Sequence, residues 1–177
     1  MLSLLPDFAD PMRLCALGKR YEGAIPLADL SRLAPLLTST EGEAAFALAF
    51  QMDAERRPSV EVRVRANLPV QCQRCLGTMV HAVDAETRLV VVGGPDEAER
   101  LPGDVDPLLV EGERFALHSL IEDELLLALP AAPRHPVEDC EVAVDAVNSP
   151  SEQRSESEAL DQESPFAVLA EWKGDKE

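Results

Sequence analysis

Two cysteines with CxxC spacing stand between two segments of alternating apolar and polar residues, and this arrangement constrains the fold more than any other part of the chain. Before the cysteines, residues 60–68 place valine, alanine or leucine at every second position, with charged or amide side chains between them. After them, residues 79–92 continue the alternation. A period of two is typical of half-buried β-strands. The pattern therefore predicts a β-hairpin with Cys72 and Cys75 at its tip.

Other segments predict a further strand and a few short helices. Residues 46–52 alternate large apolar side chains with small ones, as a strand with one heavy face does. Aspartate followed by proline at residues 10–11 is a typical helix start. Ser119 and Glu122 match the S-x-x-E capping box, which predicts a helix that begins there and ends before Pro130. We therefore expect an α+β fold with a mainly antiparallel sheet.

The segment between the first helix and this strand has weaker signals. Residues 21–23, Tyr-Glu-Gly, predict a turn. Leu27, Leu30 and Leu33 then follow at three-residue steps, which predicts a short helical stretch or an extended edge.

Composition divides the chain into three parts. The 177 residues are enough for one domain with a sizeable core. We assign residues 1–145 to an α+β domain and residues 146–163, which are polar and acidic, to a disordered linker. Residues 164–173 form a short apolar motif, in which Ser164 followed by proline predicts the start of a short C-terminal helix.

The apolar motif would have one side to bury. On a helix, Phe166, Leu169 and Trp172 fall at three-residue steps along one side, with Pro165 close by. A helix this short is marginal in water on its own, so that side needs a cover. It docks either on its own domain or in a groove of a partner. We take these four residues as candidates for partner binding.

The net charge of −17 is concentrated in the second half of the chain. Residues 1–92 carry −1, and residues 93–177 carry the remaining −16. Such a half repels nucleic-acid phosphates and attracts basic partners. The alternative is an acidic surface that only keeps the protein soluble.

One feature of the sequence points towards RNA. Arg63 and Arg65 share a strand face with Gln71 and Gln73, and Arg74 lies at the hairpin tip. Such a stripe could track phosphates, although it lacks the aromatic side chains on which bases stack. A solvated outer face of the sheet is the simpler interpretation.

The apolar runs and the cysteines indicate the compartment. No apolar run approaches the length of a membrane span, and the first residues have no basic region followed by an apolar stretch. We expect a cytoplasmic protein with no membrane partner. Four cysteines in this setting favour a metal or redox role over disulfides.

A second pair of metal-ligand residues follows the predicted helix. His135 and Cys140 lie in a proline-rich loop, and with Cys72 and Cys75 they would supply the four donors of a tetrahedral zinc site. Two alternatives remain open: a redox pair, which usually begins a helix, and cysteines without a ligand. Four protein donors close the site, whereas catalysis needs an open position. The spacing thus favours a structural site.

Other candidates for chemistry are weaker. His118 and Glu122 stand four residues apart and could share a helical face, and residues 122–124 are all acidic. Glu122 already belongs to the capping box, and a run of carboxylates is usually a solvated face. The sequence contains no P-loop, no dinucleotide-binding glycine motif and no nucleophile elbow. Nothing here predicts an enzyme.

Several phrases of the sequence occur together and in order. They are DPMRL at residues 10–14, YEGAIPLADLSRL at 21–33, CQRC at 72–75, EDELLLALP with a following P-x-H and Cys140, and SPFAVLAEWK at 164–173. In this combination the chain resembles the YceD family, the large ribosomal RNA subunit accumulation proteins. The resemblance implies a non-catalytic bacterial or plastid protein that is needed for normal accumulation of large-subunit ribosomal RNA. In bacteria the family's genes typically lie beside that of a small zinc-ribbon ribosomal protein.

From this resemblance we expect an accessory factor in ribosome biogenesis that supports the synthesis, processing or accumulation of 23S ribosomal RNA. Its partner would be a ribosome-assembly or rRNA-processing protein. An acidic chaperone for a basic ribosomal protein is the alternative binding function. A zinc hydrolase or a thiol-redox enzyme is the rival from another class.

Overall fold

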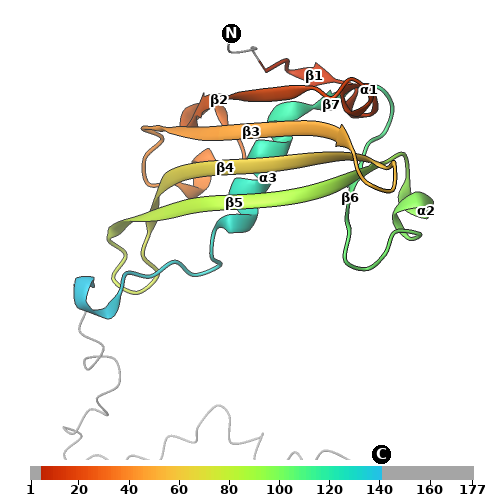
Figure 1. Cartoon of the computed structure of the whole chain (residues 1–177). Helices are drawn as coiled ribbons and strands as arrows, with labels where there is room; N and C mark the ends of the chain where they lie inside the picture. The colour runs from red at the N-terminus through yellow and green to blue at the C-terminus, as the bar shows by residue number, and fades with distance from the viewer. Residues whose placement is uncertain (1–4, 141–177) are drawn as a thin grey trace, which may run out of the picture. The chain divides into compact units, whose positions relative to one another are not determined.

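The computed structural model describes residues 5–140, and their main element is a five-stranded sheet in the order β2-β3-β4-β5-β6 (Figure 1). The first four strands pair antiparallel, whereas β6 runs parallel to β5. A separate pairing joins two short strands, β1 and β7. The strands are β1 (Phe8–Ala9), β2 (Arg20–Pro26), β3 (Glu43–Met52), β4 (Pro58–Gln71), β5 (Thr78–Val92), β6 (Asp106–Leu109) and β7 (Phe115–Ala116). The predicted α+β fold with a mainly antiparallel sheet is confirmed.

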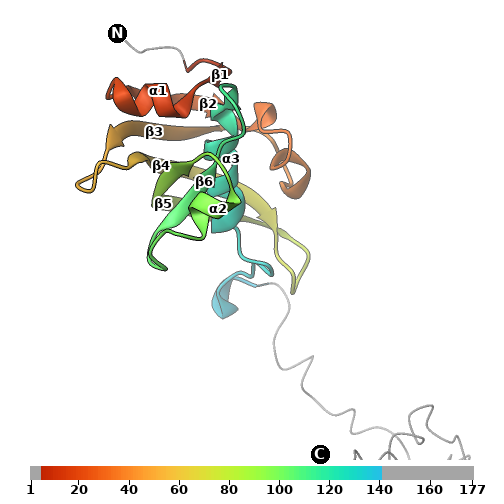
Figure 2. The same cartoon turned by 90° about the vertical axis from the view of Figure 1, so that its right-hand side faces the viewer.

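The helices are few and short, as expected. They are α1 (Pro11–Ala16), α2 (Pro95–Ala98) and α3 (Leu117–Ala128), with 3-10 turns η1 (Leu27–Asp29), η2 (Ala34–Leu36) and η3 (Val137–Asp139). Helix α3 crosses one face of the sheet, and α1 lies near one end of it (Figures 1 and 2). Among the described residues, no helix is long and apolar enough to cross a membrane.

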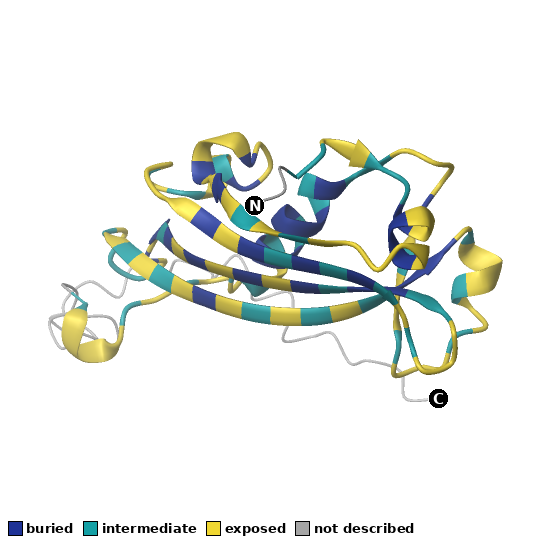
Figure 3. Ribbon diagram, turned by 45° about the horizontal axis from the view of Figure 1, so that its top comes forward, coloured by how far each residue is buried: buried dark blue, intermediate teal, exposed yellow. Residues whose placement is uncertain are grey.

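The core lies between α3 and the inner face of the sheet. Along β4, alternate residues are buried and exposed, so the strand appears striped in Figure 3. The buried apolar residues of β4 are Val60, Val62, Val64, Ala66, Leu68 and Val70, and α3 adds Leu117, Leu120, Ile121 and Leu125. Each fully buried valine or leucine side chain contributes about 1.5–3 kcal/mol. The face predicted from the alternation is the buried face.

Helix α1 begins as its sequence predicts. The Asp10 side chain accepts hydrogen bonds from the amides of Met12 and Arg13, at 2.9 and 3.3 Å. Cys15 is buried, and its thiol donates to the Ser59 carbonyl at 3.2 Å. Burial raises the pKa of the Cys15 thiol, so this cysteine is an uncharged core residue.

The predicted capping box at the start of α3 is wrong. The helix begins at Leu117, two residues earlier, where the Leu117 amide donates to the Asp7 carbonyl at 3.2 Å. The Ser119 hydroxyl donates back to the Ala116 carbonyl at 2.6 Å and caps no amide. Glu122 binds a distant loop instead of the helix start. The pairing of β7 with β1 sets where the helix begins, and the local pattern does not contain this long-range contact.

Glu122 fastens α3 to the loop that carries η1 and η2. Its carboxylate accepts hydrogen bonds from the backbone amides of Arg32 and Leu33, at 2.6 and 3.1 Å, and from the Arg32 Nε at 2.8 Å. Asp123 accepts a further bond from Arg32 at 2.7 Å. Burial raises the pKa of the Glu122 carboxyl, but these hydrogen bonds outweigh burial and hold the pKa below its usual range. Glu122 is therefore ionised in the folded protein at neutral pH.

The predicted linker, residues 146–163, and the predicted motif, residues 164–173, lie outside the described residues. The domain boundary at residue 145 lies outside them as well.

Candidate metal centre

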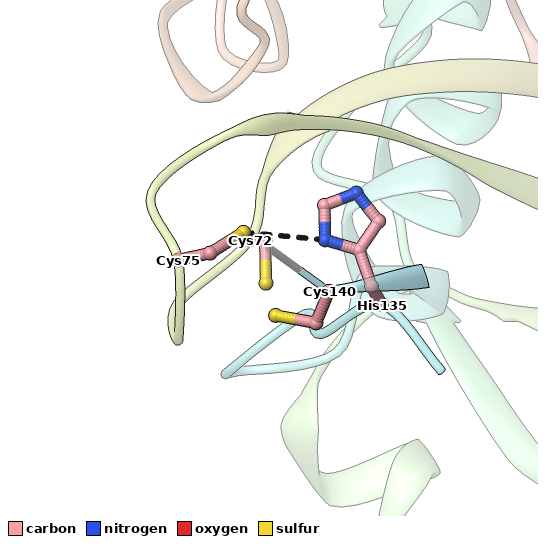
Figure 4. Close-up of side chains that lie close together, drawn as sticks. All are labelled: Cys72, Cys75, His135 and Cys140. Atoms are coloured by element: carbon pink, nitrogen blue, oxygen red, sulfur yellow. Dashed lines mark hydrogen bonds between the residues drawn. The ribbon is translucent and has the colours of Figure 1, made fainter. Parts of the chain in front are cut away.

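The turn between β4 and β5 places two cysteines on the same side of the hairpin tip. The Cys72 amide donates to the Gly77 carbonyl at 2.8 Å, and the Leu76 amide donates to the Cys72 carbonyl at 2.9 Å. Leu76 has a φ of 62°, a left-handed conformation that is uncommon outside glycine. These bonds curl the turn so tightly that the Cys72 and Cys75 side chains converge (Figure 4). The predicted CxxC at a hairpin tip is confirmed.

The loop after α3 is held against this turn by hydrogen bonds to its backbone. The Gln73 amide donates to the Pro133 carbonyl at 2.8 Å. The Arg74 guanidinium donates to the carbonyls of His135 and Pro136, at 3.0 and 3.3 Å. The short turn η3 then brings the chain back, so Cys140 also faces the hairpin tip (Figure 4). The two segments thus approach each other through contacts of their own.

All four predicted donors meet at this place. The ligand atoms of Cys72, Cys75, His135 and Cys140 lie within 4.8 Å of one another. Cys72 is buried and the other three are half-buried. A tetrahedral zinc ion with Zn–S bonds of about 2.3 Å needs its sulfurs roughly 3.8 Å apart. The cluster therefore has the donor types and the spacing for such an ion.

The imidazole of His135 is oriented as a metal ligand would be. Its Nδ1 lies 3.4 Å from the Cys75 sulfur, whereas its Nε2 lies 3.3 Å from the Thr78 carbonyl. A ligating histidine usually donates its second ring N–H to such an acceptor, which fixes the tautomer. A proton on Nε2 leaves Nδ1 unprotonated, so its lone pair faces the sulfurs and can bind a metal ion. Sequence reasoning did not find the Thr78 carbonyl, because a backbone acceptor has no residue-type signal.

The surroundings of the cluster favour a thiolate at Cys72. Burial raises the pKa of the Cys72 thiol, but the backbone amides of Cys75, His135 and Arg74 outweigh burial and lower that pKa to about 5. At Cys75 the Gly77 backbone lowers the pKa of the thiol, but burial and the neighbouring sulfurs of Cys140 and Cys72 raise it overall. Arg74 Nε donates to the Cys140 sulfur at 3.0 Å. Three thiolates and a neutral imidazole around a divalent ion leave one negative charge. The Arg74 guanidinium lies beside Cys140 and would offset this charge.

The acidic run in the middle of α3 does not form a site for acid–base chemistry. Glu122 and Asp123 are bonded to Arg32, as described above. Glu124 accepts a hydrogen bond from the Thr87 hydroxyl at 2.6 Å. These carboxylates hold α3 to its neighbours.

The remaining candidates are also accounted for by local contacts. The Nδ1 atom of His118 lies 3.9 Å from the Asp7 carboxylate. The structure does not bring His118 together with Glu122 as a metal pair. Arg63 and Arg65, two of the three arginines in the predicted phosphate stripe, are each paired with carboxylates. The carboxylates are Glu61 at 2.7 Å and Glu86 at 2.9 Å for Arg63, and Asp84 at 3.0 Å for Arg65. Their charges are therefore largely compensated within the sheet.

Comparisons with known proteins give similarity along nearly the whole chain. A family profile described as "Large ribosomal RNA subunit accumulation protein YceD" matches residues 60–173, a range that includes all four donors. A Haemophilus influenzae protein with the same description is 31% identical over 175 residues, which cover 96% of this chain and 96% of the relative. No solved structure matches significantly. The residues Pro165, Phe166, Leu169 and Trp172 lie within the matched range but outside the described residues.

Proposed function

The chain belongs to the YceD family of large ribosomal RNA subunit accumulation proteins, and from this premise we propose that it is a non-catalytic accessory factor in ribosome biogenesis. It supports the synthesis, processing or accumulation of 23S ribosomal RNA by binding other molecules in the cytoplasm. The family match carries this proposal, because it extends over nearly the whole chain. The closed geometry of the four-donor cluster supports a binding role over a catalytic one.

We further propose that the cluster holds a structural zinc ion through Cys72, Cys75, His135 and Cys140. Zinc with four protein ligands supplies a crosslink and no open position for substrate. The crosslink would join the tip of the β4–β5 hairpin to the loop that follows α3. A link between segments so far apart in sequence restricts the unfolded chain strongly.

Purified protein should contain about one zinc ion per chain, because one set of four donors is present among the described residues. Elemental analysis of protein prepared without chelator measures this ratio. The matched control is Cys15→Ser, which removes a thiol outside the cluster and should leave the zinc content unchanged. Much less than half an equivalent of zinc would contradict the proposal.

A second binding function is supported by the charge. Residues 93–177 carry −16, which suits an acidic chaperone for a basic ribosomal protein. In that function the partner is a protein with excess lysine and arginine. The paired arginines of the outer sheet face give little support to direct contact with RNA.

Depletion of the protein should lower the ratio of large-subunit to small-subunit ribosomal RNA, and expression of the full chain should restore it. Deletion of residues 164–177 should leave the melting temperature nearly unchanged, because we propose that the apolar motif packs on a partner and not on its own domain. The truncated chain should nevertheless fail to restore the ratio, since the apolar motif is proposed to bind a partner. Crosslinking and pull-down, with identification of proteins and RNA together, measure the lost association.

The control for this experiment is a deletion of residues 174–177 alone, which keeps the motif intact. A truncation at residue 164 that unfolds the domain would assign the motif to the domain itself. A truncated chain that captures the same partners as the full chain would also contradict the proposal.

A further inference from the structure

Strand β2 has one side on which none of the described strands pairs with it. It forms the edge of the sheet, and among residues 5–140 it pairs only with β3 (Figure 1). Lys19 and Leu27, which flank β2, hydrogen-bond across to the β3 side at 2.8 and 3.1 Å. Backbone groups in an antiparallel pair alternate in direction, so those of Glu22 and Ala24 point to the open side. Both residues are exposed.

A groove of about 410 Å³ runs along this open side. Five consecutive residues, 22–26, form one wall of it, and Leu5, Asp7, Asp29 and His118 also line it. Phe46 lies beneath the strand at Gly23, where a Cβ atom would come within 3.2 Å of the ring. The groove therefore combines an apolar lining with a row of backbone groups that are open to another chain.

The charge of the groove selects the occupant. Asp7, Glu22 and Asp29 contribute carboxylates, and none of the described residues that line the groove is a lysine or arginine. A nucleic-acid backbone would be repelled there. A second copy of this chain, paired edge to edge, would bring the same carboxylates together. An extended segment rich in lysine or arginine meets complementary charge.

We propose that the β2 edge binds an extended basic segment of a partner protein as an added strand. The backbone groups of Glu22 and Ala24 bond to the added strand, which gives affinity without a required sequence. Alternate side chains of a strand lie on opposite faces. The apolar side chains of the added strand therefore contact the apolar lining, which includes Ile25 and Phe46. Its basic side chains, on the other face, contact the carboxylates. This inference deepens the second function proposed above and rests on it for the kind of partner.

Binding of a labelled ten-residue peptide with alternating lysine and valine tests the charge of the groove. Fluorescence anisotropy should show saturable binding, and a peptide with glutamate in place of lysine should not bind. The double variant Glu22→Lys, Asp29→Lys should bind about tenfold more weakly, because two attractive charges become repulsive. The control, Glu99→Lys with Asp104→Lys, changes the net charge equally outside the groove and should bind like the wild type. Equal loss in both variants would overturn the proposal.

The backbone part of the proposal has its own test. The Ala24 amide points to the open side, so Ala24→Pro removes a donor for the added strand and keeps the bonds to β3. This variant should bind the peptide at least tenfold more weakly, whereas Ala24→Val, which keeps the amide, should bind normally. In the wild type, peptide should slow hydrogen exchange of the Glu22 and Ala24 amides.

Hydrogen exchange decides the question if Ala24→Pro folds poorly. Unchanged exchange at these two amides under saturating peptide would overturn the proposal. The proposal would also be overturned if the wild type were a dimer and Ala24→Pro made it a monomer, because a second copy would then occupy the edge. The peptide assay contains no ribosomal component, so its failure leaves the rRNA-ratio test untouched, and the reverse also holds.

Discussion

Replacing Cys75 with serine should lower the free energy of unfolding by roughly 4 kcal/mol or more, an effect of the size seen when a structural crosslink or metal is lost. The serine hydroxyl is a poor zinc ligand, so the cluster would keep three donors of four. The domain has its own core beneath α3, so it should lose less than a zinc-finger peptide, where zinc supplies about 10 kcal/mol or more. Urea denaturation of the two proteins measures the difference.

A chelator provides the matched control for this result. It should lower the melting temperature of the wild type and of Cys15→Ser, which changes the same atoms at a site outside the cluster. It should have little effect on Cys75→Ser, because the crosslink is already weakened. If Cys75→Ser unfolds like the wild type but fails to support rRNA accumulation, the thiol acts in function and the structural role is wrong.

Glu122→Ala should destabilise the fold by about 2–4 kcal/mol, mainly because one buried and one partly buried amide would lose their acceptor. The amides of Arg32 and Leu33 both donate to this carboxylate, and Leu33 is fully buried. The ion pair with the Arg32 side chain adds less, since that side chain is half exposed. The control is Asp123→Ala, which removes an exposed partner of the same arginine and should cost less than about 1 kcal/mol.

The contribution of Glu122 should also depend on pH. Its pKa in the folded protein lies below the usual value of about 4.3, so the stabilisation is complete above that value and is lost as pH falls through the folded pKa. The stability difference between wild type and Glu122→Gln should therefore be largest near neutral pH and should shrink in acid. Comparison with this variant cancels the acid sensitivity of the metal cluster, which both proteins share. A difference that stays constant with pH would show that the charge of Glu122 is unimportant.

The parts of the structure that could be predicted are those with a local signal. The hairpin follows from the period of two on either side of the cysteines, because a half-buried sheet forces alternation. The four donors follow from residue type and spacing, because zinc accepts few kinds of ligand. The start of α1 follows from Asp10, since its side chain bonds to amides two and three residues away.

The parts that could not be predicted depend on contacts between distant residues. Residues 21–23 predict a turn. They lie instead within β2, whose conformation is fixed by pairing with β3. Glu122 matched a helix cap, yet its partner is Arg32, 90 positions away in the sequence. The parallel arrangement of β6 against β5 likewise has no local signature. In each case the competing long-range interaction is stronger than the local preference.

The order of the four donors along the chain has a consequence for the time at which the fold is completed. Cys72 and Cys75 belong to a hairpin whose strands are neighbours in sequence, so it can form as soon as residue 92 has left the ribosome. Cys140 follows Cys75 by 65 residues, which a bacterial ribosome adds in roughly 3–13 seconds. Until His135 is added, the nascent chain carries only half of the donor set. Closure of the cluster therefore coincides with completion of the domain, and an unfinished chain would remain unlinked.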